Sequence, residues 1–132
     1  MDNAKALGIV VGSGHAAVEA ALALRRLGLD TTMIAMNPDN VCGMPCNPSI
    51  GGPGKAQIVS EIDALGGQMA LATDEATASM RLLNASKGPA VQSLRSQVDK
   101  SLYAKHMRRE LAVAGVLPGT CSSAMGVLGR FG

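Results

Sequence analysis

Aromatic side chains are nearly absent from this sequence: they make up 2% of the residues, and there is no tryptophan. A hydrophobic core without large rings must be built from aliphatic side chains, and eight methionines are available to fill its gaps. With 47% hydrophobic and 17% charged residues, the composition is still that of a globular protein. Sixteen glycines and six prolines predict a chain with many loops.

Cysteines are also few, and their number is odd: Cys42, Cys46 and Cys121 make no disulfide framework. Together with the lack of a secretory signal sequence, this predicts a reducing, cytoplasmic compartment. Glycines interrupt the longest apolar stretch, so no segment is expected to span a membrane. The net charge of +2 is too small to require a nucleic-acid partner, and it does not exclude one.

The most informative stretch is residues 7–28, LGIVVGSGHAAVEAALALRRLG. A β-branched run ends in glycines and a helical pattern follows at once, which predicts a strand, a tight turn and a helix. In a dinucleotide-binding fold, Gly12 allows the turn, Gly14 lets the backbone approach a pyrophosphate, and Ala17 lets the helix pack against the strand. The N–H groups of the first helical turn then face the phosphates. A strand–turn–helix unit without a ligand is the alternative.

A second strand is expected over residues 31–36. Dinucleotide-binding folds usually carry an Asp or Glu at the end of this strand, where it holds the ribose hydroxyls. Here the strand is followed by Asn37, which can donate or accept a hydrogen bond in that role. The missing carboxylate argues against a standard NAD enzyme and leaves a flavin site open.

Residues 37–55, NPDNVCGMPCNPSIGGPGK, are dense in Pro, Gly and Asn and predict a functional loop. The end of this loop is not a Walker A motif, because Ala56 stands where a Ser or Thr is needed. Cys42 and Cys46 are four residues apart, but no second pair of ligands completes a metal site, so no metal is predicted. Cys46 is a candidate nucleophilic or redox thiol, and a plain thiol is the alternative.

The second half of the chain carries weaker signals. We expect a helix over residues 56–65, a short strand over 79–83 and a basic helix over 93–114. Lys87, in a predicted turn, can meet a phosphate or flavin oxygen or can simply be solvated. The basic residues between 95 and 109 can bind nucleic acid or form a solvated surface. The third parallel strand of a doubly wound fold is expected near residues 113–117.

Five segments together resemble the N-terminal part of the MnmG (GidA) family. In chain order they are VVGSGHAAVEAALA, CNPSIGGPGK, EIDALGGQM, LLNASKGPAV and QVDKSLYAKHMRREL, and the resemblance runs from Ile9 to Leu111. The family adds a carboxymethylaminomethyl group at C5 of the wobble uridine of certain tRNAs. It uses FAD and methylenetetrahydrofolate, works with the GTPase MnmE, and forms homodimers.

The resemblance implies an α/β fold, namely a partial, truncated Rossmann-like FAD-binding domain of the glutathione-reductase type. It also implies that the flavin loop consists of Gly12, Ser13, Gly14, His15, Ala16 and Ala17. The catalytic cysteine of the family matches Cys46, whose thiolate would add to the uracil ring and activate the neighbouring carbon. The family also lacks the carboxylate after the second strand, but usually has glycine where Ser13 and Ala17 stand here.

The resemblance further implies two regions: residues 1–114 as the N-terminal part of the FAD-binding domain, and 115–132 as an off-family, poorly ordered tail. The family chain is several times longer, so we expect a fragment, or a truncated or frame-shifted reading of a longer gene, that is inactive by itself. The alternative is a degenerate dinucleotide-binding module with no catalytic role.

Overall fold

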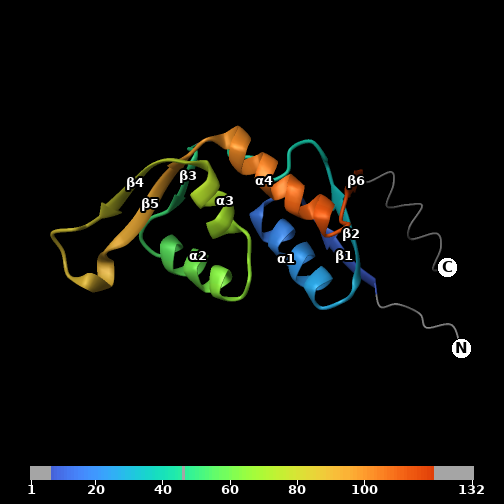
Figure 1. Ribbon diagram of the computed structural model, residues 1–132, viewed down its shortest axis with the longest axis horizontal. Coiled ribbons are helices and arrows are strands. Elements are labelled where there is room, and N and C mark those ends of the chain that lie inside the picture. Colours follow the sequence, from blue (N-terminus) through green and yellow to red (C-terminus); the bar gives the residue numbers. More distant parts are fainter. Residues whose placement is uncertain (1–6, 46, 121–132) are drawn as a thin grey trace, which may run out of the picture. The chain divides into compact units, whose positions relative to one another are not determined.

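Three parallel strands, β1 (Leu7–Val11), β2 (Asp30–Ala35) and β6 (Pro118–Thr120), form the sheet of unit 1, the first of two units in the chain (Figure 1). Their order in the sheet is β1-β2-β6. The computed structural model describes residues 7–45 and 47–120. Unit 1 contains the described residues up to Cys42 and from Arg108 onward, and unit 2 runs from Gly43 to Met107. Each unit is described below by itself.

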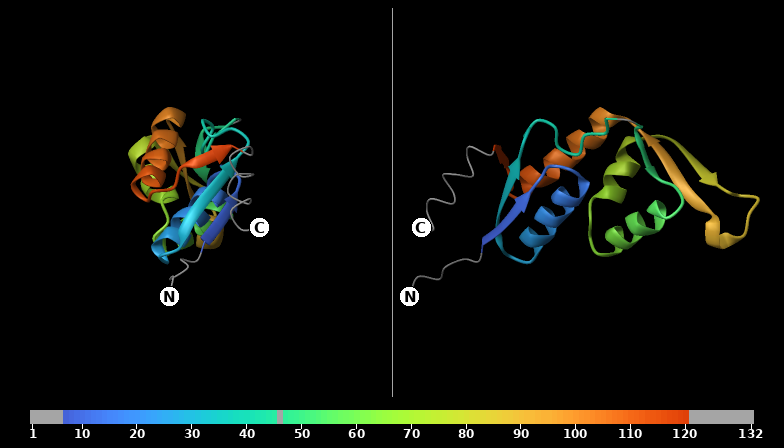
Figure 2. Two further views of the ribbon diagram at one scale, coloured as in Figure 1. Left: turned by 90° about the vertical axis from the view of Figure 1, so that its right-hand side faces the viewer. Right: turned by 180° about the vertical axis from the view of Figure 1, so that it is seen from behind.

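Unit 1 begins with the predicted strand, turn and helix. Strand β1 spans Leu7–Val11, helix α1 spans His15–Arg26 and strand β2 spans Asp30–Ala35. Strand β2 lies beside β1, and β6 (Pro118–Thr120) lies on the far side of β2. Both crossover connections therefore run in the same direction across the sheet. Because such crossovers are right-handed, α1 and the C-terminal end of the later helix α4 (Lys100–Val113) lie on the same face of the sheet (Figure 2).

The core of unit 1 is aliphatic, as the composition predicts. Its buried members come from α1, from the sheet and from the segments that flank them: Val18, Ala21, Leu22, Met33, Ala35, Val41, Leu111 and Val116. Helix α1 approaches β1 so closely that a Cβ atom on Gly8 would lie 2.8 Å from Cδ1 of Leu24. The Leu24 side chain therefore packs directly over Gly8, and a larger residue at this position would require the end of that side chain to move.

Arg25 joins three segments of unit 1. Its guanidinium donates hydrogen bonds to the Ala114 carbonyl oxygen at 2.8 Å and to the Leu29 carbonyl oxygen at 3.2 Å, and it forms an ion pair with Asp30 at 2.8 Å. The side chain therefore connects the end of α1, the start of β2 and the segment after α4. The contact with Ala114 also satisfies a carbonyl group at the C-terminal end of α4.

Unit 2 is built on an antiparallel sheet in the order β3-β5-β4. Its elements are β3 (Ser49–Gly51), α2 (Lys55–Ala64), α3 (Met69–Ala76), β4 (Thr77–Leu83), the 3-10 turn Pro89–Val91 and β5 (Ser93–Val98). Helix α4 (Lys100–Val113) begins in unit 2 and ends in unit 1. No helix in the described part of the chain is long and apolar enough to cross a membrane.

The prediction of one helix over residues 93–114 is wrong in its first part. Residues 93–98 form β5, the central strand of the sheet, which pairs with both β3 and β4. Pairing between segments distant in sequence provides the hydrogen bonds of this strand, and no local pattern reveals it. The third parallel strand also lies later than expected, at residues 118–120, because α4 continues to Val113 and Gly115 ends it with a φ of 73°.

Asp99 marks the true start of α4. One of its carboxylate oxygens accepts hydrogen bonds from the backbone N–H groups of Ser101, at 2.7 Å, and Leu102, at 2.9 Å. These two donors would otherwise lack partners inside the helix. Asp99 is therefore the N-cap of α4, and its negative charge is favourable at this end of the helix dipole.

We predict that Asp99→Ala lowers the free energy of unfolding by about 1 kcal/mol, because two helix N–H groups lose their acceptor. Urea titration followed by circular dichroism measures this change. Asp74→Ala, at an exposed position near the end of α3, is the matched control. Equal effects of the two substitutions would contradict the assignment of Asp99 as the cap, and Asp99→Asn should restore most of the loss.

Candidate functional site

The candidate site lies at the turn between β1 and α1. Gly12 has a φ of 124°, a value that residues other than glycine rarely adopt. Its N–H donates a 2.7 Å hydrogen bond to the carbonyl oxygen of Ile34 on β2, which fixes the turn to the neighbouring strand. A Cβ atom on Gly12 would lie 3.4 Å from Cβ of Ala17, so the small side chain of Ala17 lets the helix begin close to the turn.

Gly14 differs from Gly12 in an informative way. It is the N-cap of α1 with φ −76° and ψ 178°, a conformation open to any residue. A Cβ atom built on Gly14 would meet no heavy atom within 4 Å. Neither the backbone conformation nor the packing of the described chain therefore requires glycine here. The bare backbone is what a ligand needs when it approaches the start of the helix.

The electrostatics of this helix end favour an anion. Gly14 has no side chain with which to cap α1, and no acidic residue lies in the first turn. The N–H groups of this turn point out of the N-terminus, where the helix dipole places partial positive charge. His15 and Ala16 contribute backbone at this end, and His15 is partly buried. This arrangement is suited to phosphate groups.

His15 adds little charge to the site. Burial lowers the pKa of His15, and the Glu19 carboxylate opposes this with a smaller upward effect. The imidazole is therefore neutral at neutral pH. The positive character of the site thus comes from the backbone of α1.

The loop after β2 returns to the glycine turn. The backbone N–H of Cys42 donates a 2.8 Å hydrogen bond to the carbonyl oxygen of Ser13, and the Ser13 hydroxyl lies 3.4 Å from the carbonyl oxygen of Asn40. The amide oxygen of Asn37 accepts a 3.0 Å hydrogen bond from the N–H of Asp39. Asn37 therefore stabilises its own turn with its amide oxygen, one of the groups expected to be available to a ribose.

Of the two loop cysteines, the structure describes Cys42. Cys42 is 1% exposed, and its pKa is raised to about 12, mainly by burial and further by the Glu19 carboxylate. Its thiol is therefore inert at neutral pH, as expected for a small buried side chain. Cys46, the predicted nucleophile, lies outside the described residues.

The predicted basic helix is not a single surface. Arg95 lies on β5, whereas Lys100, Lys105, Arg108 and Arg109 lie on α4. Lys87 is exposed in the turn between β4 and β5. The guanidinium of Arg109 pairs with the neighbouring Glu110 at 3.1 Å.

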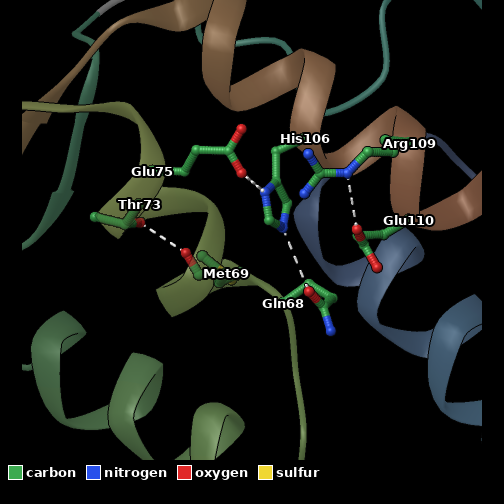
Figure 3. A network of polar contacts seen from close by, with 7 residues as sticks. All are labelled: Gln68, Met69, Thr73, Glu75, His106, Arg109 and Glu110. Atoms are coloured by element: carbon green, nitrogen blue, oxygen red, sulfur yellow. Dashed lines mark hydrogen bonds and ion pairs between the residues drawn. The ribbon is translucent and has the colours of Figure 1, made fainter.

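His106, which the sequence left without a role, is buried in unit 2. Nδ1 of His106 lies 2.6 Å from Oε2 of Glu75 on α3, and Nε2 lies 3.4 Å from the amide oxygen of Gln68 (Figure 3). These contacts join the first part of α4 to α3. Because Glu75 and His106 are 31 residues apart, no local sequence signal could have revealed the pair.

A model of the family described as glucose inhibited division protein A matches residues 8–117. The chain belongs to this family. A Syntrophomonas wolfei protein named "tRNA uridine 5-carboxymethylaminomethyl modification enzyme MnmG" is 56% identical over 103 residues, which are 78% of this chain and 16% of that protein. The protein of the same name from Thermus thermophilus is 55% identical over 104 residues, or 79% of this chain and 17% of the relative.

Solved structures agree with this assignment. The Aquifex aeolicus GidA structure matches with a TM-score of 0.74 and 47% identity, over 79% of this chain and 17% of that one. A 2-methyl-3-hydroxypyridine-5-carboxylic acid oxygenase shares the fold alone, with a TM-score of 0.56 and 13% identity, over 88% of this chain and 31% of that one. The predicted partial Rossmann-like α/β fold is confirmed, and the chain spans about a sixth of the length of its GidA relatives.

We predict that native Cys42 resists alkylation, because with a pKa of about 12 roughly one thiol in ten thousand is ionised near pH 8. Incubation with iodoacetamide followed by peptide mass mapping measures modification at each cysteine separately. Labelling in urea is the control, since unfolding exposes all three thiols. Rapid modification of Cys42 in the folded chain would contradict its burial.

Proposed function

We propose that this chain is the cofactor-binding portion of an enzyme that modifies the wobble uridine of tRNA, and that Gly12, Ser13, Gly14, His15, Ala16 and Ala17 bind the pyrophosphate of FAD. The observation that carries this proposal is Gly14, where neither conformation nor packing accounts for glycine. Membership of the GidA family supports the choice of reaction, since its relatives bear the name of that tRNA-modifying enzyme.

The residues present fit a flavin dinucleotide. The β1–α1 turn brings bare backbone and an uncapped helix N-terminus to one place, and a pyrophosphate needs both. No carboxylate stands at the end of β2, and Asn37 uses its amide oxygen in its own turn, so the usual acidic contact to the ribose would be missing. When bound, FAD would supply the redox chemistry of the one-carbon transfer, while this chain's backbone would hold and orient it.

We propose that the complete enzyme carries out the reaction of its family. Methylenetetrahydrofolate would donate the carbon, the GTPase MnmE would be the partner, and the enzyme would act as a cytoplasmic homodimer. Cys46 would be the nucleophile, its thiolate adding to the uracil ring so that the neighbouring carbon becomes reactive. Because the 103 matching residues cover 16% of their relative's length, we propose that the chain binds cofactor without completing the modification.

We predict that Gly14→Ala weakens FAD binding by roughly 10- to 100-fold, because a methyl group at the helix start obstructs charge-assisted hydrogen bonds to phosphate, each worth about 1.5–3 kcal/mol. Equilibrium dialysis against FAD measures the affinity, and absorbance after desalting shows whether flavin is retained. The melting temperature should hardly change, since the new Cβ atom meets no protein atom.

Gly88→Ala is the matched control for this substitution. Gly88 also has a negative φ, and a Cβ atom there likewise meets nothing within 4 Å. The control should bind FAD like the original chain. If Gly14→Ala binds FAD as tightly as Gly88→Ala, the glycine turn is not the pyrophosphate site. If the original chain shows no affinity for FAD, the alternative of a module without cofactor is favoured.

The proposed role of Cys46 predicts a pH profile. A thiolate nucleophile should react with iodoacetamide with a midpoint below about pH 8.5, the value of an ordinary thiol. Mass mapping at a series of pH values isolates the modification of Cys46 from that of the other cysteines. The same series in urea provides the unperturbed midpoint. A midpoint in the folded chain equal to or above the one in urea would count against a thiolate at this position.

A further inference from the structure

The hairpin of unit 2 carries positive charge without any compensating negative charge. Residues 77–98 include Arg81, Lys87 and Arg95 and contain neither Asp nor Glu. Arg81 and Arg95 lie on its two strands, β4 and β5, and Lys87 lies in the turn that joins them. All three residues are exposed. Such a distribution attracts anions to the hairpin.

The register of the sheet places the two arginines directly opposite each other. Arg81 on β4 is paired with Arg95 on β5, and the neighbouring pair on the same face is Ser79 with Gln97. These four side chains, together with Leu83, line a hollow of about 320 Å³, which we call the basic hollow. Like charges directly opposite on neighbouring strands destabilise a sheet. The pairing therefore needs an explanation other than stability.

The contacts of the two guanidinium groups leave their charge uncompensated. Nε and Nη2 of Arg95 donate hydrogen bonds to the hydroxyl oxygen of Ser49, at 3.3 and 3.0 Å, which orients the group without neutralising it. The guanidinium of Arg81 makes no hydrogen bond or ion pair with any residue that the structure describes. Several guanidinium N–H donors thus face the hollow with no anionic acceptor from the lining residues.

We propose that the basic hollow binds backbone phosphates of the tRNA substrate, an inference that rests on the proposed function. Guanidinium groups bind phosphate through paired hydrogen bonds, and two adjacent arginines suit the repeated charges of an RNA strand. Ser79 and Gln97 add neutral donors at the same surface, which suit phosphate and sugar oxygens. A bound phosphate would also offset the repulsion between Arg81 and Arg95.

The test compares Arg81→Gln and Arg95→Gln with Arg26→Gln in the 132-residue chain. Arg26 is exposed on α1, so its substitution removes the same charge from another surface. Fluorescence anisotropy with a labelled anticodon stem-loop containing the wobble uridine gives the affinity at several salt concentrations. Each hairpin variant should bind at least about fivefold more weakly than the original chain. The slope of log affinity against log salt should become smaller in magnitude by about 1. Arg26→Gln should change binding by less than about twofold.

Two further readouts separate the possible failures. The hairpin variants should melt at the same temperature as the original chain or higher, because the substitutions relieve repulsion; this excludes loss of binding through unfolding. Hairpin variants that bind RNA like Arg26→Gln, or an original chain that does not bind the stem-loop, would overturn the inference.

FAD retention is measured on the same samples. Loss of FAD with unchanged RNA binding would assign the hollow to the cofactor instead, whereas absent FAD binding in the original chain would count against the proposed function alone.

Discussion

The uncapped N-terminus of α1 is the feature on which the rest of unit 1 depends. Helix N–H groups need acceptors, and Gly14 provides no side chain for them. The surrounding contacts hold this end in place: Gly12 is bonded to Ile34 on β2, and the backbone of Cys42 is bonded to Ser13. A ligand with negative charge would satisfy the helix end, and bare backbone would let it come close. The small residues of the turn follow from this requirement.

Local pattern predicted unit 1 well and unit 2 less well. The strand before Gly12, the helix after it and the strand that follows depend on short-range signals, so their positions are confirmed within a residue or two. Strand β5 was mistaken for helix because its hydrogen bonds come from β3 and β4. Asp99, an N-cap readable in the sequence, marks where the helix really begins.

The part of the candidate site that depends on short-range signals was also predictable from the sequence. Gly12 and Gly14 were identified from spacing, and the structure adds that only Gly12 needs glycine for its conformation. The burial of Cys42 arises because the loop after β2 returns to Ser13, which no sequence pattern specifies. The pairing of Arg81 with Arg95 likewise depends on the register of the hairpin. The two units thus offer anions different groups, helix N–H donors in unit 1 and guanidinium groups in unit 2.

The most direct test of the central claim is a nitrogen–proton NMR titration of the chain with FAD, which detects even weak binding residue by residue. The account predicts that the largest shifts fall on the backbone amides from Gly12 to Ala17, and that pyrophosphate alone moves a subset of the same signals. Shifts that leave these amides unchanged, or that concentrate in unit 2, would contradict it.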